Sequence, residues 1–141
     1  MYKNDGIKLM MLTKECLKHY WQLDVGYLEP YLDEEIVMIE SSFHEFYQGK
    51  NMVSSALEQF AAHMNPKNVQ FRECMVVQQN PQSCTITGRY VVVDEADMQD
   101  FKESHTRQVQ NTDGGFHTFT FLWTQRSGES DIRLRHVHLS E

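Results

Sequence analysis

The chain has few of the residues that interrupt or cross-link a fold. Its 141 residues include only three prolines, seven glycines and three cysteines. The cysteines, Cys16, Cys74 and Cys84, are odd in number and share no C-x-x-C spacing, which argues against a disulfide framework and a zinc ribbon. We therefore expect reduced, partly buried thiols in a cytoplasmic protein.

Basic residues and long apolar runs are also scarce. Thirteen lysines and arginines against 20 aspartates and glutamates give a formal charge of −7. This balance argues against a broad nucleic-acid surface and against binding to an anionic membrane. The apolar run near the start is interrupted by charge and is too short for a signal peptide, and no later stretch approaches the length of a membrane span. We expect neither nucleic acid nor membrane as a partner.

The chain does have the length and composition of an ordinary globular domain. It is 40% hydrophobic and 23% charged, without a visible repeat. A chain of this length buries about 70% of the surface that its unfolded form exposes, so no metal or disulfide is needed for stability. Motifs of the G-x-G-x-x-G, G-x-x-x-x-G-K-[ST], H-E-x-x-H and G-x-S-x-G types are absent. We expect a single domain over residues 1–141 with no cofactor.

Two stretches have the helical spacing of apolar residues. The first predicts a helix over residues 6–22, with an apolar stripe of Leu9, Leu12, Cys16, Tyr20 and Leu23. The second precedes Pro66, with a stripe of Met52, Val53, Ala56, Leu57, Phe60 and Met64. Between them, Gly26 and Pro30 limit a further apolar piece to a short helix.

Most of the remaining chain has the composition of β-strands. Residues 35–41 predict one strand, and the F-H-E-F-Y-Q-G segment after it is expected to be a turn region. Further strands are predicted at residues 69–79, 84–95, 115–125 and 131–140. The polar stretch from Ala96 to Gly115 is long for a hairpin loop, so we expect a flap or a hidden edge strand there. Helices followed by a run of antiparallel strands predict an α+β domain in which the helices cover one face of a bent sheet.

The last two strands are predicted to form a hairpin with Ser127 and Gly128 in the turn. This register places Trp123 opposite Ile132, Phe121 opposite Leu134, Phe119 opposite His136 and His117 opposite His138. These residues and Ser140 then share the inner face, which changes from apolar to polar along its length. The wetter outer face is predicted to carry Thr118, Thr120, Leu122, Arg133, Arg135 and Val137. An unpaired buried imidazole costs about 1 to 3 kcal/mol, so a cavity is expected at the histidine end.

Several short motifs resemble the nuclear transport factor 2-like superfamily, above all its SnoaL-like branch and the association domain of calcium/calmodulin-dependent kinase II. The motifs are the terminal H-V-H-L-S, the T-F-L-W strand, the F-Y-Q-G before the second long helix and the order of the elements. The resemblance covers nearly the whole chain, and the positions that match are Phe46, Gly49, Trp123, His136, His138 and Ser140. The chain departs from the pattern at Ile132, where relatives usually carry a tryptophan.

The resemblance implies a cone-shaped, cystatin-like α+β fold. In such a fold a curved antiparallel or mixed sheet wraps around a long N-terminal helix, leaves a pocket between them, and often forms homodimers through the sheet. Together with the hairpin pattern, it predicts a pocket lined by Tyr20, Trp21, Phe60, His117, Phe119, Phe121, Trp123, His136 and His138. For most of the aromatic residues, core packing is the competing and better supported interpretation.

The histidines allow two sharper hypotheses. His117, His136 and His138 could bind zinc, but no acidic residue is obviously paired to orient them, so we expect no metal site. Histidine can also act as a general acid or base, and enzymes of this superfamily, such as ketosteroid isomerases, place carboxylates, Tyr or His in the cavity. In an enzyme, His117 or His138 is the expected base. The few candidate acids are expected to be solvated: Glu40, Glu73 and Asp94.

These observations predict a non-catalytic sensory or association domain that forms a homodimer and binds a small, at least partly apolar molecule. The alternative is a cofactor-free isomerase, dehydratase or hydrolase that uses a pocket histidine. A third possibility is an interaction module with a vestigial cavity. Fold resemblance alone does not decide among these functions.

Overall fold

The computed structural model describes residues 3–41, 45–94, 112–125 and 131–140. The helices are α1 (Lys3–Trp21), α2 (Val25–Leu28) and α3 (Lys50–His63), with a 3-10 helix, η1, at Glu29–Tyr31. The strands are β1 (Leu32–Glu40), β2 (Glu45–Gln48), β3 (Lys67–Asn80), β4 (Ser83–Asp94), β5 (Thr112–Gln125) and β6 (Ile132–Ser140). The predicted helices and strands are confirmed, and so is the α+β class.

The prediction of a turn region after β1 is wrong for Glu45–Gln48. These residues form the short edge strand β2, which pairs antiparallel with β1. Of the flap or edge strand predicted between Ala96 and Gly115, residues 96–111 lie outside the described residues, and residues 112–115 begin β5.

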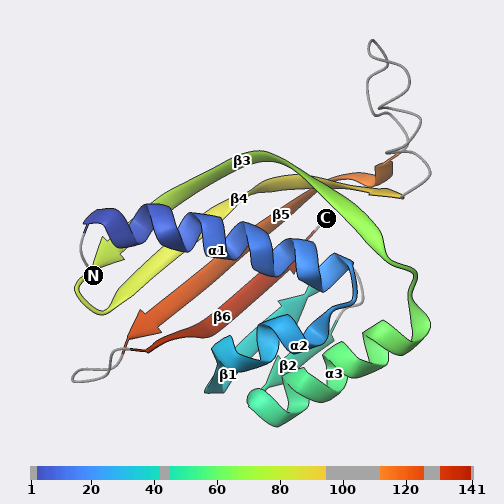
Figure 1. Ribbon diagram of the computed structural model, residues 1–141, viewed down its shortest axis with the longest axis horizontal. Helices are drawn as coiled ribbons and strands as arrows, with labels where there is room; N and C mark the ends of the chain where they lie inside the picture. The colour runs from blue at the N-terminus through green and yellow to red at the C-terminus, as the bar shows by residue number, and fades with distance from the viewer. Residues whose placement is uncertain (1–2, 42–44, 95–111, 126–130, 141) are drawn as a thin grey trace.

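The strands form one six-stranded sheet in the order β2-β1-β6-β5-β4-β3. The sheet is mixed, because β1 pairs parallel with β6 while the other neighbours are antiparallel. Figure 1 shows α1 lying across one face of the curved sheet, with α2 and α3 beside the β1–β2 edge. The helices therefore cover one face of a bent sheet, as the order of the elements predicts.

The core lies between α1 and the inner face of the sheet. Leu9, Cys16 and Leu17 of α1 are buried, and so is the alternating set of β5, which is His117, Phe119, Phe121 and Trp123. The Trp123 indole N–H donates a hydrogen bond of 2.9 Å to the hydroxyl of Thr13 on α1. This bond satisfies a buried donor and fixes the helix against the centre of the sheet.

The backbone of β4 passes very close to its neighbours at Gly88. A Cβ atom at this position would lie 2.1 Å from the carbonyl oxygen of Glu73 and 2.7 Å from the ring of Phe119. Register irregularities in the β3–β4 pairing, between Phe71 and Glu73 and between Val76 and Gln78, increase the local twist. A glycine is required here because backbone and ring occupy the space of any side chain.

The predicted register of the last hairpin is wrong. Trp123 pairs with Leu134, Phe121 with Val137 and Phe119 with Leu139. The register shifts between Trp123 and Leu122, so that Arg135 is an extra residue on β6 and the inward-outward alternation reverses after it. Val137 and Leu139 therefore face the core, and the prediction that His136 and His138 share this face fails.

Candidate functional site

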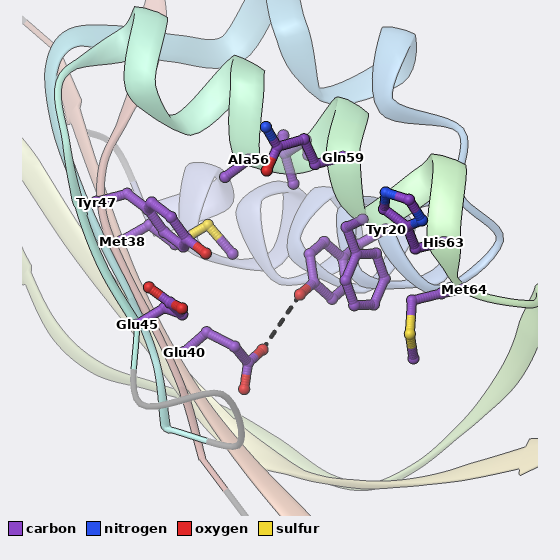
Figure 2. Close-up of a pocket in the computed structure, with 11 residues that line it drawn as sticks. Tyr20, Met38, Glu40, Glu45, Tyr47, Ala56, Gln59, His63 and Met64 are labelled. Carbon is purple, nitrogen blue, oxygen red and sulfur yellow. Dashed lines mark hydrogen bonds between the residues drawn. The ribbon is translucent and has the colours of Figure 1, made fainter.

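A cavity of about 240 Å³ lies beside the β1–β2 edge of the sheet, beneath α3. Its lining residues come from α1, β1, β2 and α3 and from the residue that follows α3: Tyr20, Met38, Glu40, Glu45, Tyr47, Ala56, Leu57, Gln59, Phe60, His63 and Met64. Figure 2 shows the strand residues on one side and the α3 residues on the other, with Tyr20 reaching between them. Pockets for drug-sized ligands usually measure about 300 to 1,000 Å³, so this cavity suits a smaller molecule.

The strand wall follows from the pairing of β1 with β2. Met38 is opposite Tyr47, and Glu40 is opposite Glu45. Residues directly opposite in an antiparallel pair point to the same face, with Cβ atoms about 4.5 to 5.5 Å apart. Alternation along β1 places Met38 and Glu40 on the inner face that Ile36 begins. Two carboxylates and a tyrosine therefore share one wall of the cavity.

Glu40 is the buried polar group of this wall. Its residue is 3% exposed, and the hydroxyl of Tyr20 donates a hydrogen bond of 3.2 Å to its Oε2 atom. Burial, and then the charge of Glu40, raise the pKa of Tyr20 well above its ordinary value, so this phenol keeps its proton and acts as a donor. The expectation that Glu40 is solvated is wrong, because this last residue of β1 lies on the inner face of the strand, where Tyr20 hydrogen-bonds to it.

Helix α3 supplies the opposite wall. Ala56, Gln59, Phe60 and His63 recur at three and four residues, which places them on one face of the helix. The Phe60 ring stacks on the Tyr20 ring with centroids 5.1 Å apart. Gly49 begins the helix at φ 90°, a conformation that favours glycine, and its N–H donates to the Ile36 carbonyl. This hydrogen bond ties the start of α3 to β1.

The structure places two of the predicted pocket residues, Tyr20 and Phe60, in the wall of the cavity. Trp21 lies behind it, where its indole donates to the Tyr90 hydroxyl at 3.2 Å and its ring meets Phe60 edge-on. His117 is also buried and packs against Trp21 and Tyr90, with its ring stacked on the Tyr90 ring at a centroid distance of 5.2 Å. Trp21 and His117 are therefore packed in the core next to the site.

The remaining predicted residues are divided between the core and the outer face. Phe119 and Trp123 are core residues, and Phe121 borders a small apolar void of about 10 Å³. His136 and His138 are half-buried on the opposite face of the sheet. The hydrogen bond of 3.3 Å between His138 Nε2 and the Ser41 hydroxyl is made there.

The outer face also has its own electrostatics. Burial lowers the pKa of His136, and the neighbouring His138 and Arg135 lower it further. Beside these histidines, Thr118 hydrogen-bonds with Ser140, and the Thr87 and Thr120 hydroxyls lie 3.1 Å apart. These hydrogen-bonded hydroxyls and the two histidines make this part of the outer face polar.

Among the described residues, no group of three or more His, Cys, Asp or Glu side chains converges as a metal site. The two sets of candidates are separated by the sheet, since His117 faces the core and His136 faces outward. Within the same described ranges, no helix combines the length and apolarity that crossing a bilayer requires.

The sequence interpretation left four polar lining residues out of the predicted pocket: Glu40, which it expected to be solvated, and Glu45, Tyr47 and His63, which it did not consider. For Glu40 a signal existed, because it continues the alternation of Ile36 and Met38 along the strand. For Glu45 and Tyr47 no comparable signal existed, because β2 has only four residues and its sequence, E-F-Y-Q, contains no β-branched side chain.

The arrangement can bind a small molecule through apolar contact and two carboxylates. Met38, Leu57, Phe60 and Met64 provide apolar surface, and Tyr20 provides a fixed hydroxyl. The lining residues in the described part of the chain include no lysine or arginine. A ligand in this cavity therefore meets aromatic, aliphatic and acidic groups.

The sequence matches no protein-family model and no curated protein. Solved structures do match. An NTF2-like protein of unknown function from Pseudomonas putida is 13% identical, with a TM-score of 0.76 over 99% of this chain and 88% of that chain. A protein with a cystatin-like fold from Caulobacter vibrioides is 13% identical, with a TM-score of 0.67 over 97% of this chain and 87% of that chain.

The association domain of CaMKII from C. elegans is also similar. It is 11% identical, with a TM-score of 0.64 over 95% of this chain and 93% of that chain. At such identities the likeness establishes the fold, and activity has to be argued from the site. The chain has the nuclear transport factor 2-like, cystatin-like fold that its motifs resemble.

Proposed function

We propose that this chain, one domain of the nuclear transport factor 2-like fold over residues 1–141, binds a small, partly apolar molecule in the cavity between α3 and the β1–β2 edge. The observation that supports the proposal most is a cavity of about 240 Å³, in which a buried, hydrogen-bonded carboxyl group lies among aromatic and aliphatic side chains. Such a combination of apolar wall and few polar groups is typical of small-molecule sites.

We further propose that the domain is a homodimer and acts in sensing or association rather than catalysis. The outer face of the sheet carries Val37, Ile39 and Leu122, all half-buried, next to hydroxyls and imidazoles. A mixed surface of this kind suits a contact between copies of the chain. The solved association domain gives the proposal further support. The free, buried thiols Cys16 and Cys84 suit a reducing compartment, so we place the protein in the cytoplasm.

Native mass spectrometry of the purified protein tests both parts, combined with identification of small molecules released on denaturation. We expect a dimer that retains a molecule of the size of the cavity. A monomer would contradict the association role, and a protein that is empty after gentle purification from cell extract would contradict the binding role.

One observation favours a second function, a cofactor-free isomerase, dehydratase or hydrolase. A buried carboxyl group and a phenol that stays protonated face the same cavity, so the carboxylate can accept a proton while the phenol donates a hydrogen bond. Glu40 would then replace His117 or His138 as the base, because neither histidine lines the cavity. Glu40→Gln distinguishes the two functions. If the protein is an enzyme, the wild type converts the small molecule that it retains and Glu40→Gln does not. If it is a binding domain, neither the wild type nor the variant converts the molecule.

A further inference from the structure

The chemistry of the cavity wall indicates what kind of molecule it takes, and this inference rests on the proposed binding function. The side chains that line the cavity are acidic and aromatic. Glu40 and Glu45 are directly opposite each other across the β1–β2 pair, so both carboxylates lie on the face that borders the cavity. Their charges give this wall of the cavity a negative potential.

The pKa values of the two tyrosines support this picture of a negative cavity. Besides burial, the charge of Glu40 raises the pKa of Tyr20, and the charges of Glu45 and Glu40 raise the pKa of Tyr47. The carboxylates thus act on phenols in two different walls. In the described lining the one residue that can become positively charged is His63, on α3.

The aromatic rings add a second attraction for positive charge. Tyr20 and Phe60 stack on one side, and Tyr47 stands on the strand wall opposite α3 (Figure 2). The face of an aromatic ring attracts a cation, most strongly where water is excluded. Aliphatic side chains, Met38, Leu57 and Met64, complete the lining and suit the carbon skeleton of a ligand.

We propose that the ligand is a small organic cation, an ammonium group on a compact apolar body, held between the Glu40–Glu45 pair and the rings of Tyr20, Tyr47 and Phe60. A hydrated inorganic ion would not use the aromatic and aliphatic wall, and an anion would meet the two carboxylates. The volume of about 240 Å³ restricts the body to a molecule below the usual drug size.

Isothermal titration calorimetry with charged and neutral molecules of equal shape tests this inference. The first pair of probes is choline and 3,3-dimethylbutan-1-ol, and the second is cyclohexylamine, protonated at pH 7.5, and cyclohexanol. We expect at least one cation to bind about tenfold or more tightly than its neutral partner. If both alcohols bind as tightly as the cations, or if no probe binds, the cation inference is overturned.

Variants locate the binding. Glu45→Gln should weaken binding of the preferred cation about fivefold and leave the alcohol unchanged. Glu58→Gln makes the same charge change on an exposed residue of α3 that does not line the cavity, and should change neither affinity. Tyr47→Leu should lower the affinity for the cation. Tyr47→Phe keeps the ring and should retain most of this affinity. Equal effects of Glu45→Gln and Glu58→Gln would contradict the site.

The result also separates this inference from the proposed function. If the neutral probes bind tightly and Ala56→Phe, which fills the cavity, abolishes their binding, the cavity is a small-molecule site but its ligand is not a cation. Absence of any retained molecule in native mass spectrometry would count against the binding function itself.

Discussion

The Tyr20 hydroxyl donates a hydrogen bond of 3.2 Å to Oε2 of Glu40, and both residues are buried. The bond joins the C-terminal half of α1 to the end of β1, which are 20 positions apart in sequence. It therefore links α1 to a strand that lines the cavity, and it satisfies polar groups that would be costly to bury alone.

Removal of this bond should be measurable as a coupling between the two residues. Tyr20→Phe is expected to lower the free energy of unfolding by about 1 to 2 kcal/mol, because it removes a donor from a buried carboxyl group. In a double-mutant cycle with Glu40→Gln, measured by urea unfolding, we expect a coupling energy of about 1 kcal/mol. Strictly additive effects would show that the contact contributes nothing to stability.

Gly88→Ala is expected to lower the free energy of unfolding by about 3 kcal/mol or more, or to prevent folding. The added methyl group would overlap the Glu73 carbonyl at 2.1 Å, and a strand backbone is not free to yield. Gly26→Ala is the matched control, since its nearest neighbour lies 3.8 Å away and alanine favours helix. Thermal unfolding of the two variants should give shifts of opposite sign. Two variants of equal stability would contradict this close contact at Gly88.

Alkaline pH should destabilise the protein through Cys16. Burial, and then the charge of Glu15, raise the pKa of this thiol from 9.0 to about 12. Since the folded state holds the proton more tightly than the unfolded state, its stabilising effect is complete below pH 9 and is lost as the pH rises toward 12. One such group lowers the free energy of unfolding by about 1.4 kcal/mol per pH unit in this window.

Urea unfolding at pH 8.0, 9.5 and 10.5 checks this dependence. The loss should be smaller in Cys16→Ala than in the wild type, by about 2 kcal/mol at pH 10.5. The raised pKa of Tyr20 adds to the loss in both proteins at the upper end, so the difference between them isolates the thiol. Parallel curves for the two proteins would show that Cys16 is not the group responsible.

The proposed dimer depends on the outer face of the sheet. Leu122 is paired with His136 there and is half-buried in the single chain. Leu122→Asp should place an unpaired charge in the contact and yield a monomer in light scattering. Ile7→Asp is the control, because Ile7 is 60% exposed on α1, which covers the other face. Dissociation by both variants, or by neither, would rule out this face as the interface.

Much of the fold could be predicted because it depends on periodicity. The alternation of His117, Phe119, Phe121 and Trp123 predicts which face of β5 is buried, and the spacing of Leu9, Cys16 and Tyr20 predicts the buried face of α1. These patterns are set by burial over many residues, so a single exception does not change the result.

The cavity was harder to predict because it depends on single residues. One extra residue at Arg135 reverses the inward-outward alternation of β6. The residue types around Arg135 do not distinguish a strand with this bulge from a regular strand. The histidines that this strand carries are thereby moved to the outer face. The acidic wall depends in turn on pairing of β1 with a four-residue strand, which is a tertiary contact and not a local preference.

The central claim is that the cavity beneath α3 binds a small molecule. Replacement of each of two alanines on this helix by phenylalanine tests it most directly. Ala56 lines the cavity, whereas Ala62 is exposed on the same helix. Ala56→Phe should fill the cavity and abolish the small molecule retained in native mass spectrometry, while Ala62→Phe should retain as much of it as the wild type. If Ala56→Phe folds with wild-type helix content and still retains the molecule, the cavity is not the binding site.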